Sequence, residues 1–266
     1  MAATPILLLG AGRMGGALIR GWSRVGAYAP ADLIIKDPHP SDEARAAEAA
    51  GARLNPGDEA LAEARTLLLA VKPQTWREAA AAIAPRLHAD AVIVSIAAGV
   101  RGADIAQAFG GRRAARVMPT TGVAIAKGVA SIFAEDASAR AAAHALFDPV
   151  ATTADIEDEA QMDAAVGVSG SAPAYLYAFI EALEAAGERQ GLAAETARTL
   201  ARATIVSAAA LLDAEGGEPA ELRRQVTSPG GTTAAALAVL TGEAGLGPLL
   251  DAAVEAAVRR SRELAG

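Results

Sequence analysis

The chain has 266 residues, enough for one large domain or two smaller ones, and its 52% of apolar but only 3% of aromatic residues imply a core of Ala, Val, Leu and Ile. A formal net charge of −7 without a basic stripe argues against nucleic-acid binding. The absence of cysteine excludes disulfides and thiolate chemistry, and no apolar run approaches the roughly 20 residues that cross a bilayer.

Strand and helix signals alternate in the first half of the chain. The start, Met1–Pro5, runs directly into a strand and lacks the charged flank and cleavage pattern of a signal peptide, so we expect a cytoplasmic protein. Short apolar runs predict strands at Ile6–Leu9, Leu33–Ile35, Thr66–Val71, Ala91–Ile96, Ala115–Met118 and Val129–Phe133. Helices are predicted near Met14–Val25, Asp42–Ala50, Trp76–Ala84, Asp104–Phe109 and Ser138–Phe147. Continuous apolar strands separated by helices are typical of a mostly parallel, doubly wound sheet.

The strand signal ends at about Thr153, and the rest of the chain is predicted to be helical. The expected helices are Pro173–Gln190, Ala193–Ala214, Pro219–Val226, Thr232–Leu240 and Pro248–Leu264. The Ala193–Ala214 helix is apolar nearly all round, which requires burial on several sides. Since a small helical domain cannot supply that burial alone, we predict an obligate dimer. The expected domains are a dinucleotide-binding α/β domain over residues 1–153 and an all-α dimerisation and substrate-binding domain over residues 154–266.

A glycine motif joins the first strand to the first helix. Gly10-Ala11-Gly12-Arg13-Met14-Gly15 follows Ile6–Leu9 and opens the helix, the context that makes G-x-G-x-x-G specific for a dinucleotide. Gly10 permits the tight turn, Gly12 lets the backbone approach a pyrophosphate, and Gly15 allows close helix packing. The helix start then donates free N–H groups to phosphate. We therefore predict a Rossmann-type unit that binds NADH or NADPH.

The end of the second strand bears on the choice of cofactor without settling it. Asp37 is suited to the adenosine ribose 2′-hydroxyl of NAD, whereas Lys36 and His39 are suited to the 2′-phosphate of NADP. The later strand ends, Val71-Lys72-Pro73-Gln74 and Ser95–Val100, point to the same crevice. Lys72 is either a catalytic base or part of a turn before a proline, and both interpretations stay open.

The reaction is expected to need little proton transfer from side chains. The histidines, His39, His88 and His144, lie in separate contexts without carboxylates at metal-ligand spacing, so we expect no metal site. A nucleophile elbow and a Walker-type lysine are both missing from the sequence. Hydride transfer to an activated C=N bond fits this inventory.

Two turns rich in Gly, Ser and Thr open helices in the second half. One is Val168–Tyr175, and the other is Val226-Thr227-Ser228-Pro229-Gly230-Gly231-Thr232-Thr233. In the second, glycines and a threonine cap would leave backbone N–H groups free at a helix start, beside hydroxyl groups. This arrangement predicts a small anion site for a carboxylate next to a nitrogen.

At these residues the chain closely resembles the pyrroline-5-carboxylate reductase family, over essentially its full length. The matching segments are Gly10–Gly16, Val71–Gln74, Ser95–Val100, Arg116–Pro119, Ala165–Tyr175, Leu222–Thr233 and Arg260–Leu264. The resemblance implies reduction of (S)-1-pyrroline-5-carboxylate to L-proline, the last step of proline biosynthesis, with NADPH slightly favoured over NADH. It also implies a homodimer through the helical domain, and higher assemblies such as decamers occur in the family.

The resemblance further assigns site residues. The backbone around Gly231 and Thr232, together with Ser228 and Gly230, would hold the substrate carboxylate, and Thr233 would be the catalytic residue that hydrogen-bonds the ring nitrogen. Asn55 would lie against the cofactor. The expected cofactor-binding residues are Gly10, Gly12, Arg13, Met14, Gly15, Lys36, Asp37, Asn55, Val71, Lys72, Pro73, Ala97, Gly99, Met118 and Pro119.

The chain departs from the family pattern at two places. Met118-Pro119-Thr120-Thr121-Gly122 stands where M-P-N-T-P is common, and Ala172 replaces a glycine in G-S-G-P-A-Y. Two alternatives therefore stay open: a reductase of another cyclic imine on the same scaffold, and a non-catalytic dinucleotide-sensing dimer. A hydroxyacid dehydrogenase is disfavoured because residues 160–183 contain no lysine.

Overall fold

The computed structural model describes residues 3–265, so Met1, Ala2 and Gly266, which the predicted domains include, lie outside it. The chain forms two compact units. The first runs to Gly170 and includes the C-terminal segment from Val258 onward, and the second is Ser171–Ala257. The expected boundary after residue 153 differs from this division, because it falls inside a strand of the first unit, Ala151–Asp155.

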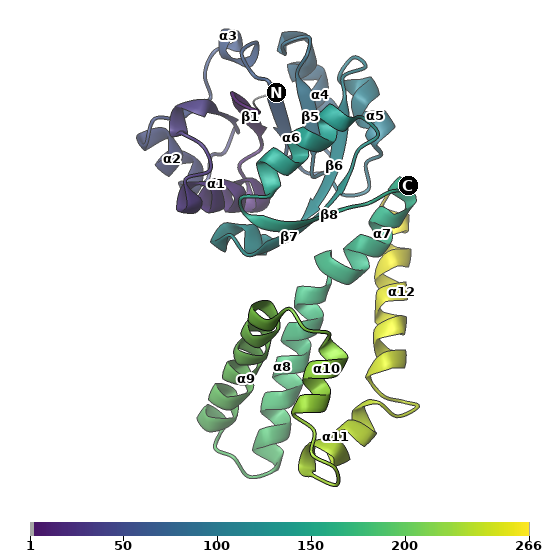
Figure 1. Ribbon diagram of the computed structural model, residues 1–266. Coiled ribbons are helices and arrows are strands. Elements are labelled where there is room, and N and C mark those ends of the chain that lie inside the picture. Colours follow the sequence, from purple (N-terminus) through teal and green to yellow (C-terminus); the bar gives the residue numbers. More distant parts are fainter. Residues whose placement is uncertain (1–2, 266) are drawn as a thin grey trace. The chain divides into compact units, whose positions relative to one another are not determined.

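The first unit is built on one sheet of eight strands in the order β3-β2-β1-β4-β5-β6-β7-β8 (Figure 1). The strands are β1 Ile6–Leu9, β2 Leu33–Lys36, β3 Arg53–Leu54, β4 Thr66–Leu69, β5 Val92–Ser95, β6 Ala114–Pro119, β7 Gly128–Phe133 and β8 Ala151–Asp155. Every residue of β1, β4 and β5 is buried, as their continuous apolar runs predict. The prediction of a mostly parallel α/β sheet is confirmed.

One strand pair is antiparallel. β6 and β7 pair antiparallel because only a short 3₁₀ turn, Thr121–Ile125, joins them, whereas a parallel pair needs a long crossover. Two strands were not predicted. β3 has two residues, too few for a periodic signal, and the residues of β8 are exposed or half-buried at the edge of the sheet.

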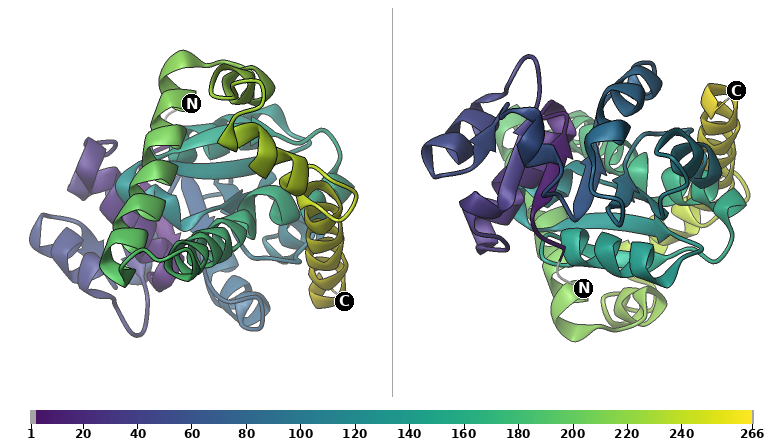
Figure 2. Two further views of the ribbon diagram at one scale, coloured as in Figure 1. Left: turned by 90° about the horizontal axis from the view of Figure 1, so that it is seen from below. Right: turned by 90° about the horizontal axis from the view of Figure 1, so that it is seen from above.

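Helices cover both faces of the sheet, as the two views of Figure 2 show. They are α1 Arg13–Val25, α2 Asp42–Ala49, α3 Asp58–Leu61, α4 Trp76–Ile83, α5 Gly102–Ala108, α6 Ala137–Phe147 and α7 Met162–Ala165. One core cluster contains Leu18, Trp22 and Phe147, and the other contains Trp76 and Phe109. The Trp22 indole Nε1 donates to the Leu146 carbonyl oxygen at 2.8 Å, which ties α1 to α6.

The second unit is entirely helical across its described residues. It contains α8 Ala172–Arg189, α9 Ala194–Glu215, α10 Pro219–Gln225, α11 Thr232–Leu240 and most of α12 Leu246–Ala265. Pro173 and Pro219 stand in first turns, as their places at the starts of predicted helices imply. Gly216 ends α9 in the left-handed conformation. Among the described residues, no helix is both long enough and apolar enough to cross a membrane.

Candidate active site

The glycine loop has the geometry that its sequence predicts. Gly10 adopts a φ of +99°, and a Cβ there would lie 2.8 Å from the Ala70 carbonyl oxygen. A Cβ on Gly15 would collide with the Gly10 carbonyl oxygen, so this position keeps α1 close to the end of β1. A Cβ on Gly12 would meet nothing within 4 Å. Gly12 therefore faces open space at the start of α1, where a ligand can approach the backbone.

The start of α1 is electrostatically open. Gly12 is the N-cap residue and makes no side-chain cap hydrogen bond, and no acidic residue stands in the first turn. The N–H groups of a first helical turn have no partner within the helix, and the helix dipole adds partial positive charge there. Together these features fit a pyrophosphate, whose oxygens accept such hydrogen bonds.

The end of β2 brings Lys36, Asp37 and Asn55 together. The Asn55 amide clamps the Asp37 backbone, because its Oδ1 accepts from the Asp37 N–H at 3.0 Å and its Nδ2 donates to the Asp37 carbonyl oxygen at 2.8 Å. The Asp37 carboxylate accepts from the Ala11 N–H at 2.5 Å and from the His39 N–H at 2.7 Å. Lys36 Nζ donates to the Pro56 carbonyl oxygen at 2.9 Å. Asp37 is thus fixed between the glycine loop and the loop after β2.

The other predicted cofactor residues lie at or just after the carboxyl ends of β4, β5 and β6. These strands run parallel to β1 and β2, so their carboxyl ends share the edge that carries the glycine loop. The residues gathered at this edge are Val71, Lys72, Pro73, Ala97, Gly99, Met118 and Pro119. Lys72 has an exposed side chain, while its carbonyl oxygen accepts from the Thr75 N–H at 3.0 Å and from Thr75 Oγ1 at 3.2 Å. These bonds place the Lys72 backbone in a turn, and the role of its exposed side chain stays a prediction.

The departures in the Thr120–Gly122 loop have a local explanation. Thr120 is buried, and its Oγ1 accepts from the Val129 N–H at 2.9 Å while its own N–H donates to the Val129 carbonyl oxygen at 2.8 Å. A Cβ on Gly122 would lie 2.6 Å from the Lys127 carbonyl oxygen. The loop therefore needs a glycine at 122, and the hydroxyl of Thr120 joins the loop to the first residues of β7.

The predicted substrate segment lies in the second unit, between α10 and α11. Gly230 adopts a φ of +69°, and the Gly231 N–H donates to the Ser228 carbonyl oxygen at 3.0 Å. The expectation of a threonine cap is wrong: Gly231 is the N-cap residue, and Thr232 begins α11. Because no side chain caps this helix start, the backbone N–H groups of its first turn remain available to a carboxylate. Thr232 is exposed and Thr233 is half-buried.

One partly buried ion pair in the first unit, near the carboxyl edge of the sheet, was not predicted. Arg116 on β6 is only 9% exposed, and its Nη1 lies 2.8 Å from Glu159 Oε1, which also accepts from the Gly102 N–H at 2.7 Å. Glu159 thereby fixes the segment that follows Gly99. An arginine inside an otherwise apolar strand is a signal for such a pair, since a charge is seldom buried unless it is paired.

Comparison with known proteins identifies the family. Residues 159–264 match the family model described as pyrroline-5-carboxylate reductase dimerisation, and residues 5–99 match the model described as NADP oxidoreductase, coenzyme F420-dependent. The chain is 39% identical to a pyrroline-5-carboxylate reductase of Pseudomonas aeruginosa, over 100% of this chain and 98% of that protein. The chain belongs to the pyrroline-5-carboxylate reductase family. Membership makes it an NAD(P)-dependent oxidoreductase.

Other members of the pyrroline-5-carboxylate reductase family agree over the full length. The enzyme of Pisum sativum is 33% identical over 96% of this chain and 94% of its own. The structure of a pyrroline-5-carboxylate reductase from Coxiella burnetii has a TM-score of 0.90 at 29% identity and covers 99% of both chains. That of Plasmodium falciparum pyrroline carboxylate reductase with NADP bound has a TM-score of 0.82 at 25% identity and covers 100% of both.

Proposed function

We propose that this protein reduces (S)-1-pyrroline-5-carboxylate to L-proline with NAD(P)H, the last step of proline biosynthesis, in a cytoplasmic setting. The observation that carries the proposal is the full-length match, at 39% identity, to the pyrroline-5-carboxylate reductase of Pseudomonas aeruginosa. Each unit has a feature that agrees with it, since the glycine loop of the first suits a pyrophosphate and the uncapped start of α11 in the second suits a carboxylate.

Different residues of the chain would bind the cofactor and the substrate. Gly10, Gly12 and Gly15 shape the loop that would hold the pyrophosphate, and Asp37 would accept from an adenosine ribose hydroxyl. When bound, NAD(P)H supplies the hydride that adds to the carbon of the C=N bond. The backbone N–H groups at Gly231 and Thr232 would fix the substrate carboxylate, and this orientation supplies much of the rate.

Thr233 is proposed to act at the ring nitrogen. A protonated imine accepts hydride more readily, and a hydroxyl that hydrogen-bonds the nitrogen assists without being a strong base. Reduction then leaves a secondary amine, with the new hydrogen on carbon and the added proton on nitrogen.

Oxidation of NADPH and NADH, each with pyrroline-5-carboxylate, tests the activity directly. We expect Thr233→Ala to lower kcat by about 100-fold or more, the lower end of the range for a general acid–base contribution, while the Kd for the cofactor stays unchanged. Thr232→Ala is the matched control, because the proposed role of Thr232 uses its backbone N–H, which alanine retains. Equal losses of turnover and cofactor affinity in Thr233→Ala would rule out this role.

We further propose that the protein is a homodimer, at least, through its helical unit. Leu200 and Val206 on α9 are 53% and 70% exposed, and Leu211 and Leu212 are exposed as well, which leaves a largely apolar helix uncovered within one chain. Light scattering after size exclusion is expected to give at least twice the chain mass, and Val206→Glu is expected to lower this mass toward that of one chain. A wild-type protein of monomer mass would contradict the proposal.

A different cyclic imine is the second candidate, favoured by the altered Thr120–Gly122 loop. A six-membered cyclic imine with the same carboxylate, assayed beside the five-membered one, distinguishes the two. The imine that is reduced with the higher kcat/KM identifies the substrate class. Failure of both imines, with cofactor binding intact, would instead favour the dinucleotide-sensing dimer.

A further inference from the structure

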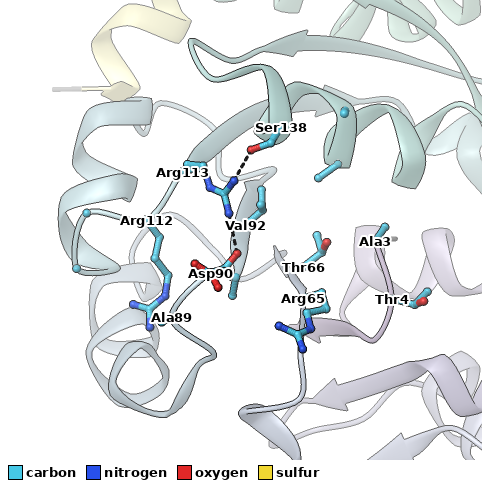
Figure 3. A pocket seen from close by; sticks show the side chains of 15 residues that line it. Ala3, Thr4, Arg65, Thr66, Ala89, Asp90, Val92, Arg112, Arg113 and Ser138 are labelled. Carbon is cyan, nitrogen blue, oxygen red and sulfur yellow. Dashed lines mark hydrogen bonds between the residues drawn. The ribbon is translucent and has the colours of Figure 1, made fainter. Parts of the chain in front are cut away.

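A cavity of about 920 Å³ opens at the amino ends of β4 and β5, in the first unit. Thr66 begins β4, Val92 begins β5, and both line it, together with Ser138 from α6 (Figure 3). The glycine loop adjoins the opposite end of β4, since the Ala70 N–H after β4 donates to the carbonyl oxygen of Leu9, which precedes Gly10, at 2.8 Å. A strand rises about 3.3 Å per residue, so the length of β4 separates the cavity from the cofactor edge by roughly 13 Å.

Positive charge gathers around this cavity in a chain whose net charge is −7. Arg65, Arg112 and Arg113 line it, against the single carboxylate of Asp90. Asp136 lies nearby and also interacts electrostatically with Arg113, while its carboxylate accepts from the N–H groups of Ser138 and Ala139 and from the Ser138 hydroxyl. Three arginines therefore face two carboxylates, which leaves an excess of positive charge around the cavity.

The guanidinium groups of Arg112 and Arg113 are held in place by neutral oxygens. Arg112 donates to the backbone carbonyls of Leu87, His88 and Phe109 at 2.6–3.2 Å. Arg113 lies between Ser138 Oγ at 2.8 Å and the Asp90 carbonyl oxygen at 2.9 Å, as Figure 3 shows. Since a guanidinium has five N–H donors, two remain on Arg112 and three on Arg113. A guanidinium group that is held in place and has unused N–H donors is suited to binding phosphate or carboxylate.

Arg65 adds a third charge from the neighbouring segment. Its Nη1 lies 2.9 Å from His88 Nε2, and His88 Nδ1 is 3.9 Å from the carboxylate of Asp90. The remaining walls are mostly small and apolar, formed by Ala89, Ala91, Val92, Ala141 and Ala142. A volume of 920 Å³ lies in the range of small-molecule sites.

We propose that this cavity is a second ligand site, separate from the active site, which binds a small polyanion through Arg65, Arg112 and Arg113. The shared chemistry is two or more phosphate or carboxylate groups on a compact body. Neither the hydride transfer nor the dimer proposed above uses these residues.

Calorimetric titration of the NADPH-saturated protein with pyrophosphate, and separately with citrate, tests the site at low ionic strength. Saturating cofactor occupies the glycine loop, which would otherwise attract pyrophosphate itself. We expect one saturable site per chain for at least one probe, and the tighter probe distinguishes a phosphate ligand from a carboxylate ligand. Arg65→Gln and Arg113→Gln are expected to weaken that binding at least tenfold, with the Kd of NADPH unchanged.

Arg45→Gln, an equal change of charge on the exposed face of α2, is the control. An equal loss in this control would show general attraction to the protein and overturn the proposal, as would the failure of both probes to bind. Arg113 also joins Ser138 to Asp90, so Arg113→Lys provides a variant that keeps the charge if Arg113→Gln does not fold. We expect the lysine variant to bind the probe with an affinity between those of wild type and Arg65→Gln.

Discussion

Adding the same methyl group at Gly12 and at Gly15 is expected to impair different properties of the protein, cofactor binding at Gly12 and stability at Gly15. At Gly12 the backbone is extended, with φ −69°, and a Cβ meets nothing within 4 Å, so the free protein has room for alanine. At Gly15 a Cβ collides with the Gly10 carbonyl oxygen and lies 3.1 Å from the carbonyl carbon. Gly12→Ala should therefore impair the ligand site, and Gly15→Ala the packing of α1 on β1.

The magnitudes follow from these contacts. Overpacking of this kind costs about 1–3 kcal/mol of unfolding free energy, from which the better helix propensity of alanine recovers at most about 1 kcal/mol. Gly12→Ala should change the free energy of unfolding by less than about 1 kcal/mol, the scale of an N-cap substitution. The methyl group would occupy the space of a pyrophosphate, so we expect cofactor affinity to fall at least tenfold, or about 1.4 kcal/mol.

Urea unfolding without cofactor and calorimetric titration with NADH and NADPH measure the two effects separately. The variants control for each other, because each adds one methyl group within the same turn. Gly12→Ala that binds both cofactors like wild type would refute the placement of the pyrophosphate at this helix start. Gly15→Ala with wild-type stability would refute the packing argument.

Two further predictions concern charged groups. Asp37→Asn should raise the ratio of kcat/KM for NADPH to that for NADH by about tenfold (~1.4 kcal/mol), since it removes a negative charge from the position proposed to face the ribose 2′ group. An unchanged ratio would contradict the proposed role of Asp37. The pKa of His144 is raised above its usual range, chiefly by a hydrogen bond to Asp148 and to a smaller extent by Asp155. Because the pKa is higher in the folded state, protonated His144 stabilises the fold. The full contribution is present below the unfolded-state pKa of about 6.5 and is lost as pH rises through the folded-state pKa. His144→Gln should therefore cost up to about 1 kcal/mol at pH 5.5 and less at pH 9 in urea unfolding, and an equal cost at both pH values would contradict it.

The sequence by itself determined the features whose signals are local. Three features depend only on residues within a few positions of one another. They are the glycine spacing from Gly10 to Gly15, the apolar runs of β1, β4 and β5, and the start of α11 at Thr232. Such signals are strong because a turn, a buried strand or a helix start requires particular residue types in a fixed order.

Only the tertiary structure decided the features that depend on distant residues. The Arg116–Glu159 pair joins residues 43 positions apart, and the indole of Trp22 bonds a carbonyl 124 positions away. β8 is a strand because it pairs with β7, so the first unit extends past residue 153. The cap of α11 was misassigned because a glycine N-cap has no side-chain signal. Likewise, the three arginines around the 920 Å³ cavity come from positions 65, 112 and 113, and only the pairing of the strands brings them together.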